Sequence, residues 1–254
     1  MLPWRPLRAP VRPFAVPQPL EVPVPVPRPF AEVWPAAEPI DGWLTRDQAQ
    51  VLHEQAARVA PGLVVEIGNH LGRSTVVLGA SGAEVAAIDP FPSGWKYGGE
   101  DTAARFAANL RTAAVHDAVT QHPRPSTDVL ADWETPIRML YVDGKHDARS
   151  CLQDLGWTRH LGRGDRFLVH DAFSSVGVTL ALLWWLVTDR RSRYLGRTGS
   201  LALYEMTRPT VTDRARVLGE LPWFARNLLV KVLLRLRQRR LARLLGHTIA
   251  ADPY

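Results

Sequence analysis

Two acidic residues and two glycines have the types and spacing of a ligand-binding loop. Glu66 ends an apolar run that leads directly into Gly68 and Gly72, and Asp89 follows the next apolar run. Glycine lets a backbone approach a ligand closely, and a carboxylate at the position of Asp89 can accept the hydroxyls of a ribose. Glu66 would repel a pyrophosphate and attract a cationic amino group. These residues predict an adenosyl ligand with a cationic tail, S-adenosylmethionine; the alternative is that both acids only stabilise turns.

Four further polar residues follow two later apolar runs. Asp143 and His146 come after residues 137–142, and His170 and Asp171 come after residues 166–169. Carboxylates suit a hard divalent cation, so Asp143 and Asp171 are predicted to hold Mg²⁺ or Mn²⁺, which would lower the pKa of an acceptor hydroxyl. His146, next to Asp143, is the predicted catalytic base, or else only a hydrogen-bonding group. For His170 we expect a structural role.

Alternating strands and helices must position these residues. The apolar runs predict strands at residues 63–67, 84–88, 118–121, 137–142 and 166–169, and a hairpin near 196–199. Helical spacing predicts helices at residues 46–59, 74–79, 102–114, 148–160 and 176–189. This order is typical of an α/β fold, a Rossmann-like, doubly wound and mostly parallel sheet of about seven strands. The carboxyl ends of its strands would gather both groups of polar residues at one edge.

The motifs VVEIGNHLGRST, AAIDPF and LYVDGKHDARSCLQDLGWTRHLGRGDRFLVHDAFSSVGV resemble those of class I S-adenosylmethionine-dependent methyltransferases. The similarity is to the bacterial group related to macrocin O-methyltransferase and cephalosporin hydroxylase, and it covers residues 40–206. It implies a cofactor site made of Glu66, Gly68, Asn69, Gly72, Ser74, Asp89 and Ser126, with Ser126 near the adenine. It also implies magnesium near Asp143 and Asp171.

The sequence departs from that family at two positions. Several relatives have an acid where Lys145 stands, and several have one where His170 stands, which makes His146 the better base candidate. The resemblance implies methylation of a hydroxyl on a sugar, a glycan or another small natural product. Two alternatives stay open: a non-catalytic binding or scaffold protein that kept the cofactor fold, and a nicotinamide-dependent oxidoreductase, which the missing G-x-G-x-x-G argues against.

Composition divides the 254 residues into a body and two tails. Residues 1–39 contain 12 of the 21 prolines and predict an extended arm; residues 40–208 form the methyltransferase-like domain, and residues 209–254 a basic helical tail. The single cysteine, Cys151, excludes a disulfide framework. Residues 91–100, with Trp95 and Tyr97 between glycines, predict a mobile cover over the site.

The basic charge lies in the tail. Residues 221–251 hold seven of the basic residues and no acidic one, within a net charge of +6. We expect one helix over residues 222–246, packed on its own domain, on an anionic membrane or on a partner helix, with homo-oligomers left open. No nucleic-acid-binding motif, secretory signal or membrane span is evident. The expected location is cytoplasmic, or peripheral at the inner face of the membrane.

Overall fold

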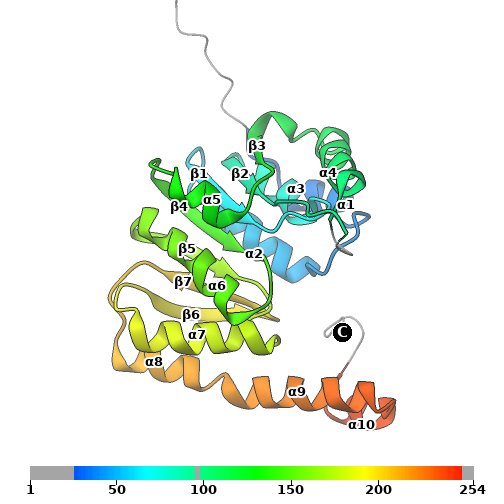
Figure 1. Ribbon diagram of the computed structural model, residues 1–254, viewed down its shortest axis with the longest axis vertical. Coiled ribbons are helices and arrows are strands. Elements are labelled where there is room, and N and C mark those ends of the chain that lie inside the picture. The colour runs from blue at the N-terminus through cyan, green and yellow to red at the C-terminus, as the bar shows by residue number, and fades with distance from the viewer. Residues whose placement is uncertain (1–25, 95–97, 248–254) are drawn as a thin grey trace, which may run out of the picture.

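The computed structural model describes residues 26–94 and 98–247, and its centre is one twisted sheet (Figure 1). The seven strands lie in the order β3-β2-β1-β4-β5-β7-β6. Their bounds are β1 Leu63–Ile67, β2 Glu84–Ile88, β3 Val119–His122, β4 Ile137–Val142, β5 Leu161–Val169, β6 Arg193–Thr198 and β7 Leu201–Glu205. Strands β1 to β5 are parallel, whereas β7 and β6 add an antiparallel hairpin. The predicted Rossmann-like fold is confirmed.

Helices cover both faces of the sheet. They are α1 Phe30–Ala37, α2 Arg46–Ala57, α3 Arg73–Gly79, α4 Glu100–Thr112, α5 Ser126–Ala131, α6 Ala148–Leu155, α7 Val176–Thr188, α8 Val211–Leu218, α9 Leu221–Arg235 and α10 Arg239–Leu244, with short 3-10 turns at His116–Ala118 and Gly156–His160. One core packs α1 to α4 against the sheet, and the other packs α5 to α8. Because strand side chains alternate, Met139 and Tyr141 of β4 face the first core, and Leu140 and Val142 face the second.

The folded body begins before residue 40, where the sequence predicted only an extended arm. Helix α1 buries Val33, Trp34 and Ala37 in the first core, and the backbone N–H of Arg28 donates to Ala80 O at 2.9 Å. The apolar residues of FAEVWPAA recur at helical spacing, and they pack on α2 and α3. Residues 28–39 therefore belong to the domain, and residues 1–25 of the predicted arm lie outside the described residues.

The predicted C-terminal helix is two helices. Helix α9 ends where Arg237 adopts a left-handed conformation, with φ of 59°. The N–H groups of Arg237 and Gln238 then donate to the carbonyls of Leu234 and Leu233, which is a Schellman ending. Helix α10 turns back along α9, and Nε of Arg226 donates to Leu245 O at 2.9 Å. One continuous helix was predicted because residues 235–238 contain neither glycine nor proline to mark the turn.

The inner face of α9 packs on the protein's own domain. Asn227 and Val230 are buried, and Nδ2 of Asn227 donates to Phe173 O at 3.1 Å. Nζ of Lys231 donates to Ser174 O at 2.7 Å. Helix α9 thus holds the loop that follows β5. Within the described residues, no helix combines the length and apolar character needed to cross a bilayer.

Candidate active site

The loop after β1 is held by the protein's own backbone. Gly68 has φ of 91°, and a Cβ atom there would lie 2.1 Å from the carbonyl oxygen of Asp143. Gly72 has φ of 88°, and its Cβ would meet the ring of Phe106 at 3.0 Å. Both glycines were predicted in the loop for close approach of a ligand. The nearest atoms are instead those of the segment directly after β4 and of α4, so the glycines first serve the packing of the loop.

Asp89 joins this loop to the end of β2. Its Oδ2 accepts the N–H groups of Asn69 and His70 at 3.1 and 3.0 Å, and its Oδ1 accepts the N–H of Phe91 at 2.9 Å. The turn-stabilising role that the sequence left as an alternative is therefore present. A carboxylate has about four acceptor positions, so three backbone donors leave room for one further hydrogen bond. Burial raises the pKa of Asp89 above its ordinary value.

Glu66 and Asn69 bring unused polar atoms to the same loop. Glu66 is fully buried, and its Oε2 accepts the hydroxyl of Thr75 at 2.6 Å. Within the described residues, Oε1 of Glu66 and both amide atoms of Asn69 have no hydrogen-bond partner. Burial raises the pKa of Glu66 to about 7, although the neighbouring hydroxyl groups of Ser74 and Thr75 oppose that rise. Buried polar groups without partners are costly, so this corner suits a polar ligand.

Ser74 and Ser126 lie at helix starts near the same sheet edge. Ser74 is buried in the first turn of α3, beside Glu66. Ser126 begins α5 after β3, and its hydroxyl donates to Asp154 of α6. Burial raises the pKa of Asp154 to about 6. The hydroxyl of Ser126 is thus engaged with a protein carboxylate, and its predicted contact with adenine stays a prediction.

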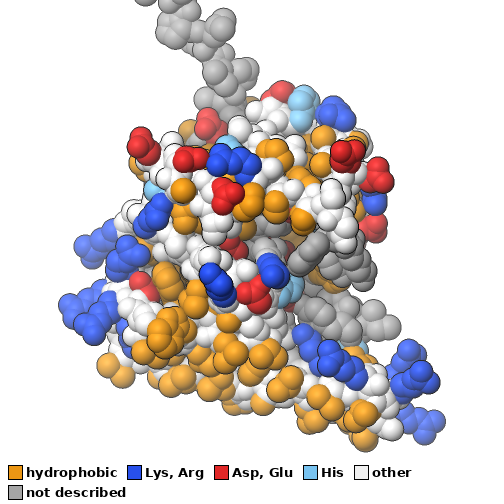
Figure 2. Space-filling view, viewed as in Figure 1, with side chains coloured by type: hydrophobic (Ala, Val, Ile, Leu, Met, Phe, Trp, Pro, Cys, Tyr) orange, Lys and Arg blue, Asp and Glu red, His pale blue; other side chains and the backbone are white. Residues whose placement is uncertain are grey.

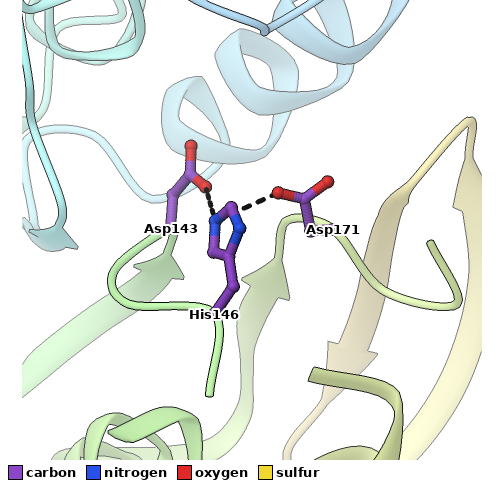
Figure 3. A group of neighbouring side chains, drawn as sticks. All are labelled: Asp143, His146 and Asp171. Carbon is purple, nitrogen blue, oxygen red and sulfur yellow. Dashed lines mark ion pairs between the residues drawn. The ribbon is translucent and has the colours of Figure 1, made fainter. Parts of the chain in front are cut away.

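Asp143, His146 and Asp171 meet where β4 and β5 end (Figure 3). The strands are parallel neighbours with Val142 opposite Val169, so the residues that follow them lie side by side. Figure 3 shows the His146 ring between the two carboxylates. Nε2 of His146 is 3.0 Å from Asp171 Oδ2 and 3.7 Å from Asp143 Oδ1. The predicted juxtaposition is confirmed, with the histidine in its centre.

His170 lies behind this cluster. Its side chain is 3% exposed, and its Nδ1 lies 3.3 Å from Asp143 Oδ1 and 3.6 Å from Asp171 Oδ2. Its Nε2 lies 3.3 Å from Oε1 of Gln48. The imidazole therefore has acceptors at both nitrogens, which suits the protonated ring.

Three supporting residues were missed by the sequence analysis. Gln48 of α2 reaches His170, Tyr141 donates its hydroxyl to Asp143 Oδ2 at 3.1 Å, and Ser174 donates to Asp171 Oδ1 at 3.0 Å. Only Gln48 could have been noticed in the sequence, because it follows Thr45 by three residues, the spacing of a capping box at a helix start. Lys145 lies outside the cluster, is exposed, and pairs with Asp147 at 3.3 Å.

A family model described as a methyltransferase domain matches residues 65–172, which include both the glycine loop and the cluster. Residues 65–172 of the chain are therefore a methyltransferase domain. The solved structures of two methyltransferases have the same fold. The O-methyltransferase of Bacillus cereus in complex with SAH has a TM-score of 0.52 and 16% identity, over 69% of this chain and 88% of that one. The O-methyltransferase TomG of Streptomyces achromogenes, in complex with SAM, has a TM-score of 0.53 and 17% identity, over 70% and 89%.

The carboxylates and histidines of the cluster shift one another's pKa values. Burial opposes ionisation of Asp143 and Asp171, yet His170 and His146 outweigh it and hold the pKa of both carboxyls below the ordinary value. Burial also opposes a charge on His170, but Asp143 and Asp171 raise its pKa well above 6.5. The neighbouring carboxylates of Asp143 and Asp171 raise the pKa of His146 above its ordinary value. His170 is thus a buried counter-ion, and the half-exposed His146 is the member of the cluster that solvent can reach.

The methyltransferase's predicted cover is only partly described. Gly99 begins α4, and its N–H donates to Phe91 O at 3.0 Å, which closes the base of the loop. Trp95 and Tyr97, which the sequence predicted as faces for an acceptor ring, lie outside the described residues. Their role stays a prediction.

Proposed function

We propose that this methyltransferase transfers a methyl group to a hydroxyl of a sugar, a glycan or another small natural product, with His146 as the base. The observation that carries the proposal is the position of His146 between Asp143 and Asp171, at the same sheet edge as the glycine loop. Methyl transfer to an alcohol requires the loss of one proton, and an imidazole within reach of the hydroxyl can accept it.

The loop after β1 has the chemistry needed to hold the cofactor. We assign Glu66, Gly68, Asn69, Gly72, Ser74 and Asp89 to its binding, and Ser126 to the adenine side. The unpartnered Oε1 of Glu66 and amide of Asn69 provide acceptors and a donor for an amino-acid moiety, and Asp89 retains one acceptor position for a ribose hydroxyl. When bound, S-adenosylmethionine supplies a methyl group already activated by its sulfonium.

The protein's own residues then position and deprotonate the acceptor. His146 is the half-exposed member of the cluster, so it can meet an incoming hydroxyl. Asp143 and Asp171 stabilise the imidazolium that forms, and His170 balances their charge from behind. Tyr141 and Ser174 fix the two carboxylates through their hydroxyls.

A metal centre at Asp143 and Asp171 is a second candidate. Donor atoms of these residues and His146 lie within 4.8 Å of one another, which a divalent cation could bridge. However, His146 cannot be both a ligand through Nε2 and a free base. His170 also lies within 3.6 Å of both carboxylates, so it competes with a cation for the same oxygens. We therefore favour a base mechanism without metal.

The choice of acceptor rests on resemblance and on the relatives. TomG is involved in tomaymycin synthesis. The decisive experiment is turnover of S-adenosylmethionine with panels of sugars, lipid-linked glycans and phenolic natural products, with release of S-adenosylhomocysteine and the mass of the product as readouts. A methylated hydroxyl that disappears with His146→Ala supports the proposal. A product methylated on nitrogen or carbon, or full activity of His146→Ala, contradicts it.

A further inference from the structure

Exposed apolar side chains concentrate on the helices of one edge of the molecule. Fourteen large hydrophobic side chains are exposed among the described residues, and twelve belong to α7, α8, α9, α10 or the turn before α10. They are Val176, Leu180, Trp184, Val187, Val211, Leu218, Leu228, Leu229, Val232, Leu236, Leu241 and Leu244. Figure 2 shows hydrophobic side chains gathered over these helices along the lower edge of the view. Clustering of this kind marks an interaction surface.

The spacing of these residues forms one stripe per helix. On α7, Val176, Leu180, Trp184 and Val187 follow one another at intervals of four, four and three residues, and α7 contains no charged residue. On α9, Leu229 and Val232 continue toward Leu236 at intervals of three and four. Such stripes are normally covered, and within the described residues they are not.

The charges around this surface have one sign. Between residues 176 and 247, nine arginines are exposed: Arg190, Arg191, Arg208, Arg216, Arg235, Arg237, Arg239, Arg240 and Arg243. None of the four acidic residues in that range is exposed. Asp189, Glu205, Asp213 and Glu220 each accept hydrogen bonds from neighbouring protein groups. The outer surface of this region is therefore apolar and cationic.

The turn between α9 and α10 carries both exposed apolar and exposed cationic side chains. The left-handed Arg237 reverses the chain, so that Leu236, Leu241 and Leu244 are exposed beside Arg235, Arg237, Arg239, Arg240 and Arg243. Arginine stems can lie along apolar surface while their guanidinium groups reach anionic headgroups. Leucines next to arginines on a helix suit insertion into the headgroup boundary.

We propose that the surface formed by α7, α8, α9 and α10 docks on an anionic lipid bilayer. A second copy of the chain would bring the same positive charge to the contact, whereas anionic headgroups neutralise it. Since no described helix has the length and apolar character of a membrane span, the surface lies on the bilayer and does not cross it. This inference goes beyond methyl transfer and does not depend on it.

Flotation of the full chain with vesicles tests the proposal. Vesicles of phosphatidylcholine with phosphatidylglycerol should carry the protein, binding should fall as salt rises, and vesicles of phosphatidylcholine alone should bind far less. Arg239→Ala with Arg240→Ala should weaken partitioning about 30-fold, at about 5-fold for each arginine near the surface. The matched control is Arg46→Ala with Arg111→Ala, two exposed arginines of α2 and α4. It removes the same charge and should leave binding unchanged.

A second pair of variants tests the apolar contribution without disturbing the core. Leu236→Gln with Leu244→Gln changes residues that are 63% and 82% exposed, and it should weaken partitioning at least tenfold. Val26→Gln, at 82% exposure, is the control. Equal binding to both kinds of vesicle, no binding, or equal loss in the control variants would overturn the proposal. A dimer in lipid-free sedimentation that Leu236→Gln with Leu244→Gln dissociates would overturn it in favour of self-association.

Discussion

Nε2 of His146 lies 3.0 Å from Oδ2 of Asp171, across the boundary between two neighbouring parallel strands. The side chain of Asp171 is 4% exposed, whereas that of His146 is 48% exposed. A buried carboxylate thus orients a histidine that solvent can reach. The proposed base is therefore accessible, whereas the carboxylate beside it is buried.

Removal of the imidazole should abolish most of the turnover. His146→Ala is expected to lower kcat by about 10²–10⁴-fold, the usual contribution of a general base. Lys145→Ala is the control, because Lys145 is exposed and pairs with Asp147 outside the cluster. Steady-state methylation of one acceptor compares the two variants. Equal losses in both would show that the segment matters only for its structure.

The pH profile should report His146 directly. A base acts in its neutral form, and Asp143 and Asp171 raise the pKa of His146, so kcat should rise with pH through a midpoint above 6.5. Asp171→Asn removes one of these charges and should move the midpoint to lower pH. The measurement is kcat against pH at saturating cofactor and acceptor. If Asp171→Asn leaves the midpoint unchanged, the group that titrates in this profile is not His146.

Chelation should leave turnover unchanged in the base mechanism. We expect full activity in EDTA, and no gain on adding Mg²⁺ or Mn²⁺, because His146 and His170 both contact the carboxylates that a cation would need. Activity that is lost in EDTA and restored by magnesium would instead make His146 a ligand with Asp143 and Asp171. Binding of the metal alone, followed by calorimetry, gives an independent readout.

Glu66 should make the cofactor-free protein less stable as pH rises. Its pKa is about 7 in the folded protein, against 4.5 as the ordinary value, so protonation favours the folded state. The contribution is fully present below pH 4.5 and is lost as pH rises through about 7. The loss amounts to about 3 kcal/mol. Chemical unfolding at several pH values should show this slope in the wild type and a smaller slope in Glu66→Gln, which should also bind S-adenosylmethionine more weakly.

Asp89→Ala should damage both the loop and the cofactor site. The substitution leaves the N–H groups of Asn69, His70 and Phe91 without their acceptor. The free energy of unfolding should therefore fall by about 1–3 kcal/mol. Cofactor affinity should fall by a comparable free energy. Asp89→Asn keeps one acceptor oxygen and should lose less of both. Thermal unfolding with and without the cofactor separates the effect on folding stability from the effect on cofactor affinity. If Asp89→Ala has normal stability, Asp89 does not stabilise the loop.

Local sequence patterns were sufficient to predict the sheet and the edge of it that carries the candidate site. Buried parallel strands are continuous apolar runs, and the residues that follow them must meet, so Asp143, His146 and Asp171 could be grouped in advance. The helix predicted from residue 46 begins there, as α2. The predicted strand at residues 166–169 is shorter than β5, because the glycines near its beginning concealed the extension to Leu161.

Tertiary contacts decided the features that the sequence did not reveal. The charge on His170 depends on two carboxylates and on Gln48, which lies far away in the chain. The close approach of Gly68 to Asp143 joins β1 to β4, and no local pattern announces it. The break at Arg237 places an arginine where glycine is usual, so a composition-based prediction extended the helix through it.

The two hydrogen bonds from α9 to the loop after β5 have a thermodynamic consequence. Asn227 and Lys231 hold the carbonyls of Phe173 and Ser174, two and three residues after Asp171. Both Asp171 and Phe173 have left-handed backbones. The outer face of α9 and the acceptor side of the cluster therefore share one short segment. If a bilayer bound at α9 changes the free energy of that segment, it changes the affinity of the cluster for the acceptor by some factor. A bound acceptor then changes the affinity of α9 for the bilayer by the same factor, because the coupling of two binding sites is reciprocal. Lys231→Met, which removes one of the two links, should reduce both factors equally.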